Sequence, residues 1–162
     1  MAKITFMGAG STVFAKNVLG DCMMTPALEE STIALYDIDK VRLEESASML
    51  EAINRNNGSK AKIEKYLGVE NRRDALRGAG YVVNAIQVGG YDPCTITDFE
   101  IPKKYGLRQT IADTLGVGGV FRALRTIPVA GNVRRSGRTA EEVRGAQGAL
   151  PLDPMLRRVR PF

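Results

Sequence analysis

Histidine is absent from all 162 residues of this sequence. Its absence excludes the commonest general base, the commonest metal ligand and every catalytic triad that depends on histidine. Cysteine is scarce as well: Cys22 and Cys94 are too few for a disulfide framework, so a reduced cytoplasmic setting is expected. No apolar run approaches the roughly 20 residues of a membrane span, and the N-terminus has no secretory signal, so no membrane association is expected.

The excess of positive charge lies at one end of the sequence. The net charge is +5, yet residues 1–129 hold 16 Lys and Arg against 15 Asp and Glu, whereas residues 130–162 hold 7 arginines against 3 acids. We therefore predict one folded domain over residues 1–129 and a basic, irregular tail over residues 130–162. Such a tail is typical of an arm for nucleic acid or a membrane surface, but also of a shifted reading frame. We favour the shifted frame, so nucleic acid is not an expected partner.

What is present is a glycine-rich turn near the N-terminus. An apolar run, Lys3 to Met7, is followed by Gly8, Gly10, Ser11 and Thr12 and then by a helical pattern. A strand, a glycine turn and a helix N-terminus together hold the pyrophosphate of a dinucleotide. Ser11 and Thr12 either cap the helix or donate to a phosphate oxygen. The alternative is a strand–helix turn without a ligand, since the third glycine of the full motif is Val13.

A second apolar run, residues 32–37, ends in an acid, Asp37. An acid at the end of the second strand of a dinucleotide-binding unit accepts hydrogen bonds from the adenosine ribose and repels a 2′-phosphate, which favours NAD over NADP. The alternative is that Asp37 or Asp39 caps the next helix. We assign the cap to Asp39, which leaves Asp37 for the ribose.

The remaining patterns predict an α/β fold. We expect strands near residues 2–7, 32–37, 62–66 and 81–86, the last buried on both faces, with helices over 40–56, 71–78 and 120–127. This alternation predicts a Rossmann-like parallel sheet with helices on both faces, as in the NAD-binding domain of lactate and malate dehydrogenases. Pro128 should end the last helix. A fifth strand should follow; if the tail cannot supply it, the sheet keeps an apolar edge that favours homo-oligomers.

Two further segments lie where the rest of a ligand is expected. Residues 84–91 follow the fourth strand, at the nicotinamide end of a bound dinucleotide. The glycine-rich segment 111–119 offers Asp113 as an acceptor and Thr114 as a donor. Its glycines either permit close approach to a ligand or make a flexible turn.

Three segments together resemble glycoside hydrolase family 4, and within it the bacterial α-galactosidases. They are Ile4 to Ser11, Asn84 to Tyr91 and Ala112 to Gly119, and the resemblance covers residues 1–129. It implies NAD, Mn²⁺ and a sugar substrate, and a mechanism in which NAD⁺ removes hydride from C3, the C2 proton is lost, the aglycone is eliminated, water adds and hydride returns to C3. By motif, Gly8, Gly10, Ser11 and Thr12 would hold the pyrophosphate; Asp37 the ribose; Asn84, Gln87 and Val88 the nicotinamide side; and Asp113 and Thr114 the sugar.

The sequence also departs from this family. Relatives that act on 6-phosphorylated sugars carry arginine along the segment matching residues 87–99, which here has neither lysine nor arginine and so favours an unphosphorylated α-galactoside. The metal-binding Cys–His pair and further histidine of the family are missing. We therefore predict a truncated or frame-shifted α-galactosidase that has no catalytic or metal-binding residues of its own and is inactive alone. The alternative is a non-catalytic dinucleotide-binding module whose basic tail binds a partner.

Overall fold

The computed structural model describes residues 1–108 and 116–136, with side chains up to residue 131. The elements follow in the order β1 (Lys3–Met7), α1 (Thr12–Met24), β2 (Thr32–Asp37), α2 (Lys40–Asn56), β3 (Lys62–Leu67), the 3-10 turn η1 (Val69–Asn71), α3 (Arg72–Leu76), β4 (Tyr81–Asn84), the π-helical turn η2 (Gly90–Thr95), α4 (Ile96–Lys104) and α5 (Val117–Ser136). Within these ranges, no helix has both the length and the apolar character that membrane crossing requires.

The four strands form one parallel sheet in the order β3-β2-β1-β4. The register places Ile4 beside Ile33 and Phe6 beside Leu35. The chain starts at the central strand β1, builds outward to β3 and then returns to the other side of β1 for β4. This reversal creates a switch point between β1 and β4, the place where ligands bind in sheets of this kind.

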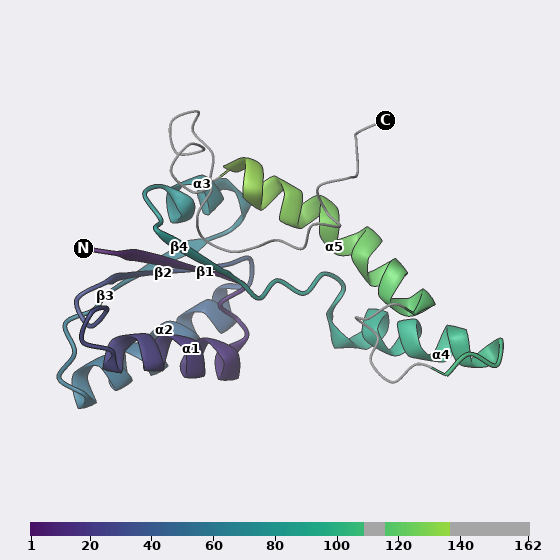
Figure 1. Ribbon diagram of the computed structural model, residues 1–162, viewed down its shortest axis with the longest axis horizontal. Coiled ribbons are helices and arrows are strands. Elements are labelled where there is room, and N and C mark those ends of the chain that lie inside the picture. The colour runs from purple at the N-terminus through teal and green to yellow at the C-terminus, as the bar shows by residue number, and fades with distance from the viewer. Residues whose placement is uncertain (109–115, 137–162) are drawn as a thin grey trace.

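Helices cover both faces of the sheet, as predicted (Figure 1). On one face, Ile4 and Phe6 of β1 pack with Leu19 of α1 and with Leu43 and Leu50 of α2. The alternate residues of β1 and β2 face α3, where Met7, Tyr36, Ala75 and Leu76 form a second, smaller core. The alternation of side chains along each strand therefore builds a three-layered arrangement from short apolar runs.

The fourth strand departs from its prediction. Its apolar sequence indicates burial on both faces, but Tyr81 is 55% exposed and Val82 is 40% exposed. β4 lies at the edge of the sheet and ends at Asn84, two residues before the predicted end. No fifth strand covers it within the described residues.

The last helix also differs from its prediction. α5 continues through Pro128 to Ser136, whereas Pro128 was expected to end it. Proline removes one helical N–H and its ring crowds the carbonyl four residues earlier, which disfavours a helix interior without forbidding it in a helix of 20 residues. The helix thus extends seven residues into the predicted tail; residues 137–162 lie outside the described residues. The division of the chain at residue 129 stays a prediction.

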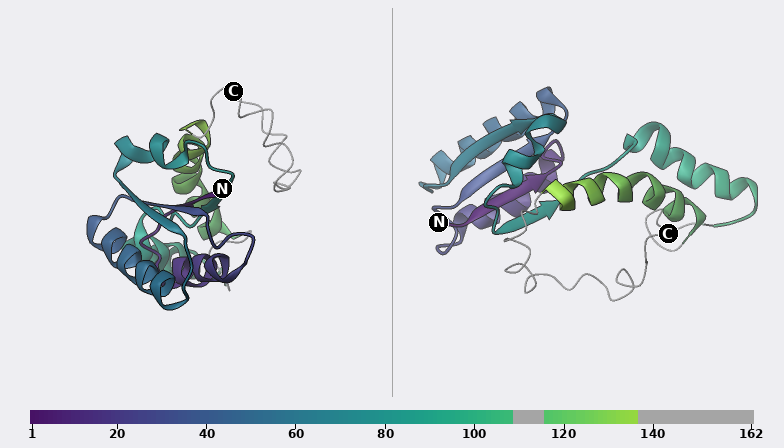
Figure 2. Two further views of the ribbon diagram at one scale, coloured as in Figure 1. Left: turned by 90° about the vertical axis from the view of Figure 1, so that its left-hand side faces the viewer. Right: turned by 90° about the horizontal axis from the view of Figure 1, so that it is seen from above.

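The helices α4 and α5 form an arm that extends away from the sheet (Figure 2). They pack against each other, while the C-terminal part of α5 returns to α3. The segment between β4 and α4 therefore connects the sheet to this arm.

Candidate functional site

A cavity of about 700 Å³ opens at the carboxyl ends of β1, β2 and β4. Its lining comes from the end of β2, from the turns after β1, β2 and β4, from η1, from the first turns of α2 and α3, and from α5: Gly8, Gly10, Ser11, Tyr36, Asp37, Ile38, Asp39, Arg42, Val69, Arg72, Ala85, Ile86, Gln87, Val88, Gly89 and Val129. The cavity thus lies at the switch point of the sheet, as expected for a dinucleotide site.

Gly8 and Gly10 lie where a side chain would not fit. Gly8 has a φ of +88°, and a Cβ there would lie 2.7 Å from the carbonyl oxygen of Ala85. A Cβ at Gly10 would lie 2.9 Å from Oδ2 of Asp37. Both distances are shorter than any that real Cβ atoms make, so the loop and the next strand can approach this closely only because both residues are glycine.

Asp37 is fixed by two backbone N–H groups. The N–H of Gly10 donates to Oδ2 at 2.6 Å, and the N–H of Asp39 donates to Oδ1 at 2.9 Å. Asp39 caps α2, as predicted, because its carboxylate accepts from the N–H groups of Val41 and Arg42. Asp37 is therefore left at the cavity wall, partly exposed, with its carboxylate held in one orientation.

The N-terminus of α1 points toward the same cavity. Ser11 occupies the capping position, but its side chain makes no capping hydrogen bond. The hydroxyl of Thr12 donates to the carbonyl of Gly10 at 3.4 Å, and Thr12 does not line the cavity. The first turn of α1 contains no acidic residue, so its N–H groups and positive dipole end remain suited to an anion.

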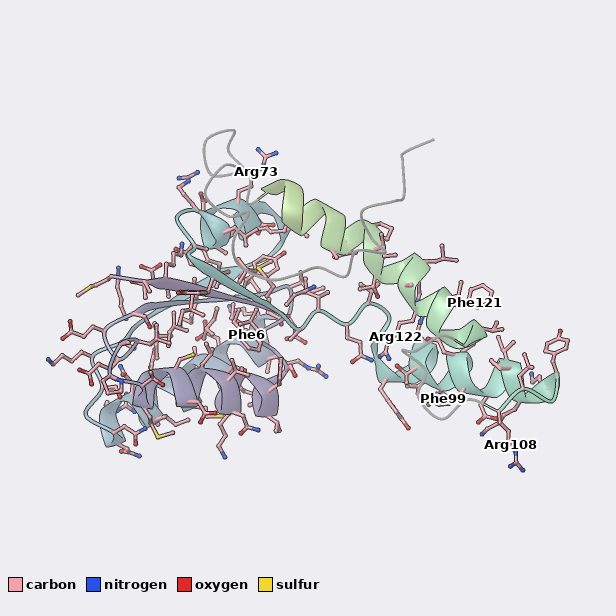
Figure 3. The ribbon with its side chains drawn as sticks, viewed as in Figure 1. Phe6, Arg73, Phe99, Arg108, Phe121 and Arg122 are labelled. Carbon is pink, nitrogen blue, oxygen red and sulfur yellow. The ribbon has the colours of Figure 1, made fainter. Side chains whose placement is uncertain are left out.

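The predicted nicotinamide side is only partly assembled. Gln87 and Val88 line the cavity, whereas Asn84 lies outside it and accepts a hydrogen bond from the N–H of Ile86 at 3.3 Å. A second cavity, of about 390 Å³, lies between this loop and α5 and is lined by Ile86, Gln87, Gly119, Arg122, Ala123, Thr126 and Ile127. Arg122 is labelled in Figure 3. Ile86 and Gln87 line both cavities.

A buried ion pair holds the arm together beside this loop. The two terminal guanidinium nitrogens of Arg125, on α5, donate to Asp98 on α4, one of them at 3.0 Å to Oδ1. Asp98 is only 4% exposed, so its charge depends on Arg125 for compensation. The pair therefore connects α4 to α5.

The cavity is also lined by residues that were not predicted to belong to the site: Tyr36, Ile38, Asp39, Arg42, Val69, Arg72 and Val129. Ile38 directly follows β2 and Val69 lies two residues after β3, so the rule that ligands bind beyond the carboxyl ends of strands could have identified them. Arg42 is a member of the amphipathic helix α2, and its sequence position gives no such signal. Asp113 and Thr114, the predicted sugar contacts, lie outside the described residues.

The described residues do not form a metal site. In residues 1–108 and 116–136, no three His, Cys, Asp or Glu side chains are grouped so that they could hold an ion. The chain as a whole has no histidine to contribute. Mn²⁺ therefore has no fitting set of ligands in this part of the chain.

Comparison with known proteins gives a family and a fold. The model for family 4 glycosyl hydrolases matches residues 3–138. The α-galactosidase of Bacillus subtilis (strain 168) is 63% identical over 129 residues, which are 80% of this chain and 29% of that protein. The α-galacturonidase of Thermoanaerobacter italicus is 37% identical over 127 residues, or 78% of this chain and 26% of that protein. The chain thus spans less than a third of the length of these relatives.

A solved structure agrees with the described fold. The 6-phospho-β-glucosidase of Thermotoga maritima, determined with manganese, NAD⁺ and glucose-6-phosphate, matches 85% of this chain and 32% of its own, with a TM-score of 0.67 and 25% identity. The predicted Rossmann-like fold is therefore confirmed, as is the family that the three sequence segments resemble.

Proposed function

Because the chain belongs to glycosyl hydrolase family 4, we propose that the cavity at the carboxyl end of its sheet binds NAD⁺. The observation that carries this proposal is the cradle at Gly8 and Gly10, where a Cβ would collide with the backbone of Ala85 and with the carboxylate of Asp37. The two glycines thus hold the turn close to the end of β2 and to the segment after β4, directly before a helix N-terminus, which is the arrangement of a dinucleotide-binding turn. The cavity of about 700 Å³ is also within the usual size range of cofactor sites.

The proposed roles follow from where the residues lie. The N-terminus of α1, with Gly8, Gly10 and Ser11, faces the pyrophosphate, because its N–H groups carry a positive partial charge. Asp37 accepts from the hydroxyls of the adenosine ribose. Gln87 and Val88 lie toward the nicotinamide. When bound, the cofactor supplies hydride acceptance, and the residues described here bind and orient it.

Calorimetric titration with NAD⁺ tests this proposal. We expect saturable binding of NAD⁺ and weaker binding of NADP⁺, since the carboxylate of Asp37 repels a 2′-phosphate. Asp37→Ala should weaken NAD⁺ binding about tenfold or more, the equivalent of about 1.4 kcal/mol in lost hydrogen bonds. Asp21→Ala, which removes an exposed acid on α1, is the matched control and should bind normally. Failure of the unmodified chain to bind either nucleotide would reject the proposal.

The substrate of the complete enzyme is proposed from the similarity. The α-galactosidase of Bacillus subtilis is the relative with 63% identity, and residues 87–99 have no lysine or arginine to neutralise a sugar phosphate. We therefore propose an unphosphorylated α-galactoside and a cytoplasmic, NAD-dependent glycosidase of which this chain provides the NAD-binding part. No step is assigned to Mn²⁺, since the described residues do not fit it.

We propose that this chain alone does not hydrolyse glycosides. The test is release of nitrophenol from p-nitrophenyl α-galactoside by the purified chain with NAD⁺, Mn²⁺ and a reductant. We expect no release above a heat-killed sample, and release above it would contradict the proposal.

We also propose that the chain forms homo-oligomers, because the exposed edge of β4 leaves Tyr81 and Val82 uncovered. Sedimentation at several concentrations tests this expectation.

A further inference from the structure

One buried hydroxyl lies directly behind the glycine turn. Ser46 on α2 is fully buried, and its Oγ donates to the carbonyl oxygen of Ala9 at 2.6 Å. A serine in the middle of a helix commonly bonds to the carbonyl one turn earlier or faces solvent. Ser46 instead contacts a residue 37 positions away, within the apolar face of α2 formed by Leu43, Ala47 and Leu50.

The carbonyl that Ser46 binds belongs to the same peptide group as the N–H that binds Asp37. That group joins Ala9 to Gly10, and its N–H donates to Oδ2 of Asp37 at 2.6 Å. A trans peptide is planar, with its C=O and N–H pointing in opposite directions. Ser46 and Asp37 therefore hold one rigid unit from its two sides.

We infer that Ser46 is a positioning residue of the NAD⁺ site, which acts through the Ala9–Gly10 peptide on Asp37. This inference rests on the proposed function. The hydrogen bond from Ser46 keeps the carbonyl directed toward α2, so that the N–H of Gly10 stays directed at the carboxylate. Each bond in such a chain also polarises the next, which strengthens the bond between Gly10 and Asp37.

Loss of the Ser46 hydroxyl should therefore weaken the hydrogen bonds between Asp37 and the ribose of NAD⁺. In Ser46→Ala, the carbonyl of Ala9 loses its donor, and the peptide group is free to turn. Asp37 then keeps only its bond from the N–H of Asp39 and loses the orientation in which it accepts from the ribose. Partners behind the residues that touch a ligand act in this way in metal sites, where their loss weakens binding although they make no contact themselves.

The fold offers a matched control for the buried hydroxyl. Thr5 on β1 is also fully buried, and its Oγ1 donates to the carbonyl of Ala75 at 2.7 Å. This bond has the same chemistry and burial, but it lies on the face of the sheet that α3 covers and touches neither the cavity nor the glycine turn. Thr5→Val should thus lower the stability as Ser46→Ala does, without affecting the ligand.

The experiment is a double-mutant cycle on NAD⁺ affinity, measured by calorimetry on the full chain. We expect Ser46→Ala to weaken binding about fivefold, in line with the loss of one buried hydrogen bond, and Thr5→Val to leave it unchanged. If Ser46 acts through Asp37, the loss disappears in an Asp37→Ala background, so the double variant binds like Asp37→Ala alone. Thermal unfolding of each variant separates an effect on the site from an effect on the fold.

Three outcomes overturn the inference while leaving the proposed function intact: normal binding by Ser46→Ala, an equal loss in Thr5→Val, or additive losses in the double variant. A chain that binds no NAD⁺ in its unmodified form overturns the proposed function and this inference together. If Ser46→Ala does not fold, Ser46→Cys takes its place, because a thiol is a weak donor of similar size. We expect a smaller loss with Ser46→Cys, and unchanged affinity would reject the inference.

Discussion

The sheet half of the molecule, which comprises β1 to β4 with α1 to α3, buries a core of large apolar side chains, whereas the α4–α5 arm exposes several of its own. The buried hydrophobic core of the described residues runs from Ile4 to Leu76, within the sheet and the helices α1 to α3. In the arm, Tyr105 is 78% exposed, Leu124 63% and Phe121 53%. The sheet half therefore has a core of its own, while the arm has a large apolar surface and one buried ion pair.

This difference bears on the proposed site. The glycine turn, Asp37 and Ser46 all belong to the sheet half, so the adenosine and pyrophosphate side of the cavity rests on a packed core. The loop with Gln87 and Val88 leads into the arm, so the nicotinamide side depends on how the arm is held. We expect the two sides to respond differently to mutation.

The largest effect should come from truncating a core phenylalanine. Phe6 is fully buried and packs edge-on against Phe14, with ring centroids 5.7 Å apart. Phe6→Ala should lower the free energy of unfolding by about 3–5 kcal/mol, whereas Phe121→Ala on the exposed surface of α5 should change it by less than about 1 kcal/mol. Both rings are labelled in Figure 3. Urea denaturation measures the free energy of unfolding of both variants. Equal losses in Phe6→Ala and Phe121→Ala would show that the arm has a core as tightly packed as that of the sheet half.

The next largest difference in stability should be the one between two glycine-to-alanine variants, at Gly8 in the sheet half and Gly106 in the arm. Gly8 and Gly106 have φ values of +88° and +72°, so alanine is strained at both by about 1–2 kcal/mol. Only at Gly8 does the new Cβ also meet backbone, whereas Gly106 at the end of α4 has open space around it. We expect Gly8→Ala to lose clearly more stability than Gly106→Ala, and to lose NAD⁺ binding as well. A similar loss at both positions would contradict the close approach of Gly8 to Ala85.

The ion pair of the arm should have a local effect. Arg125→Met leaves Asp98 buried without its partner, so α4 should separate from α5, and its amide hydrogens should exchange faster. Exchange in α1 and α2 should stay unchanged, because the sheet half has its own core. Lys103→Met is the control, since its ion pair with Glu100 is exposed on both sides and surface pairs contribute little. Unchanged exchange in α4 would mean that other contacts hold the arm.

The same contrast explains which parts of the fold and the site the sequence predicts. The elements of the sheet half were predicted closely because their apolar periodicity reflects burial, and Asp39 was recognised as a cap from its position before a helix. The exposure of Tyr81 was not predicted, because an apolar run does not reveal whether a neighbouring strand covers it. The continuation of α5 through Pro128 was not predicted either, because the favourable interactions of a long helix can exceed the cost of one proline. Ser46 has a sequence environment like any serine in an amphipathic helix. Its role depends on which carbonyl the fold brings to it.

The smallest effect should come from the ionisation of Tyr66 on β3, for which Tyr105 of the arm is the control. Burial, together with a hydrogen bond from its hydroxyl to Glu64, raises the pKa of Tyr66 on β3 to about 12. Since an unfolded tyrosine ionises near pH 10, the unfolded chain loses this proton first, and stability should fall as the pH rises from about 10 to 12. Tyr66→Phe should remove this part of the fall. Absorbance of tyrosinate, taken as the difference between the unmodified chain and Tyr66→Phe, should show one phenol ionising at about pH 12.

Two controls make this last test specific. Tyr105→Phe, which changes an exposed ring of the arm, should leave the ionisation step near pH 12 in place. Burial also raises the pKa of Tyr36, so the step must be taken from the difference between variants and not from the total absorbance. A difference spectrum with its midpoint near pH 10 would mean that burial does not disfavour the ionised form of Tyr66. The edge formed by β3 would then be open to solvent, and the contrast between the two regions would be limited to β1, β2 and the helices that cover them.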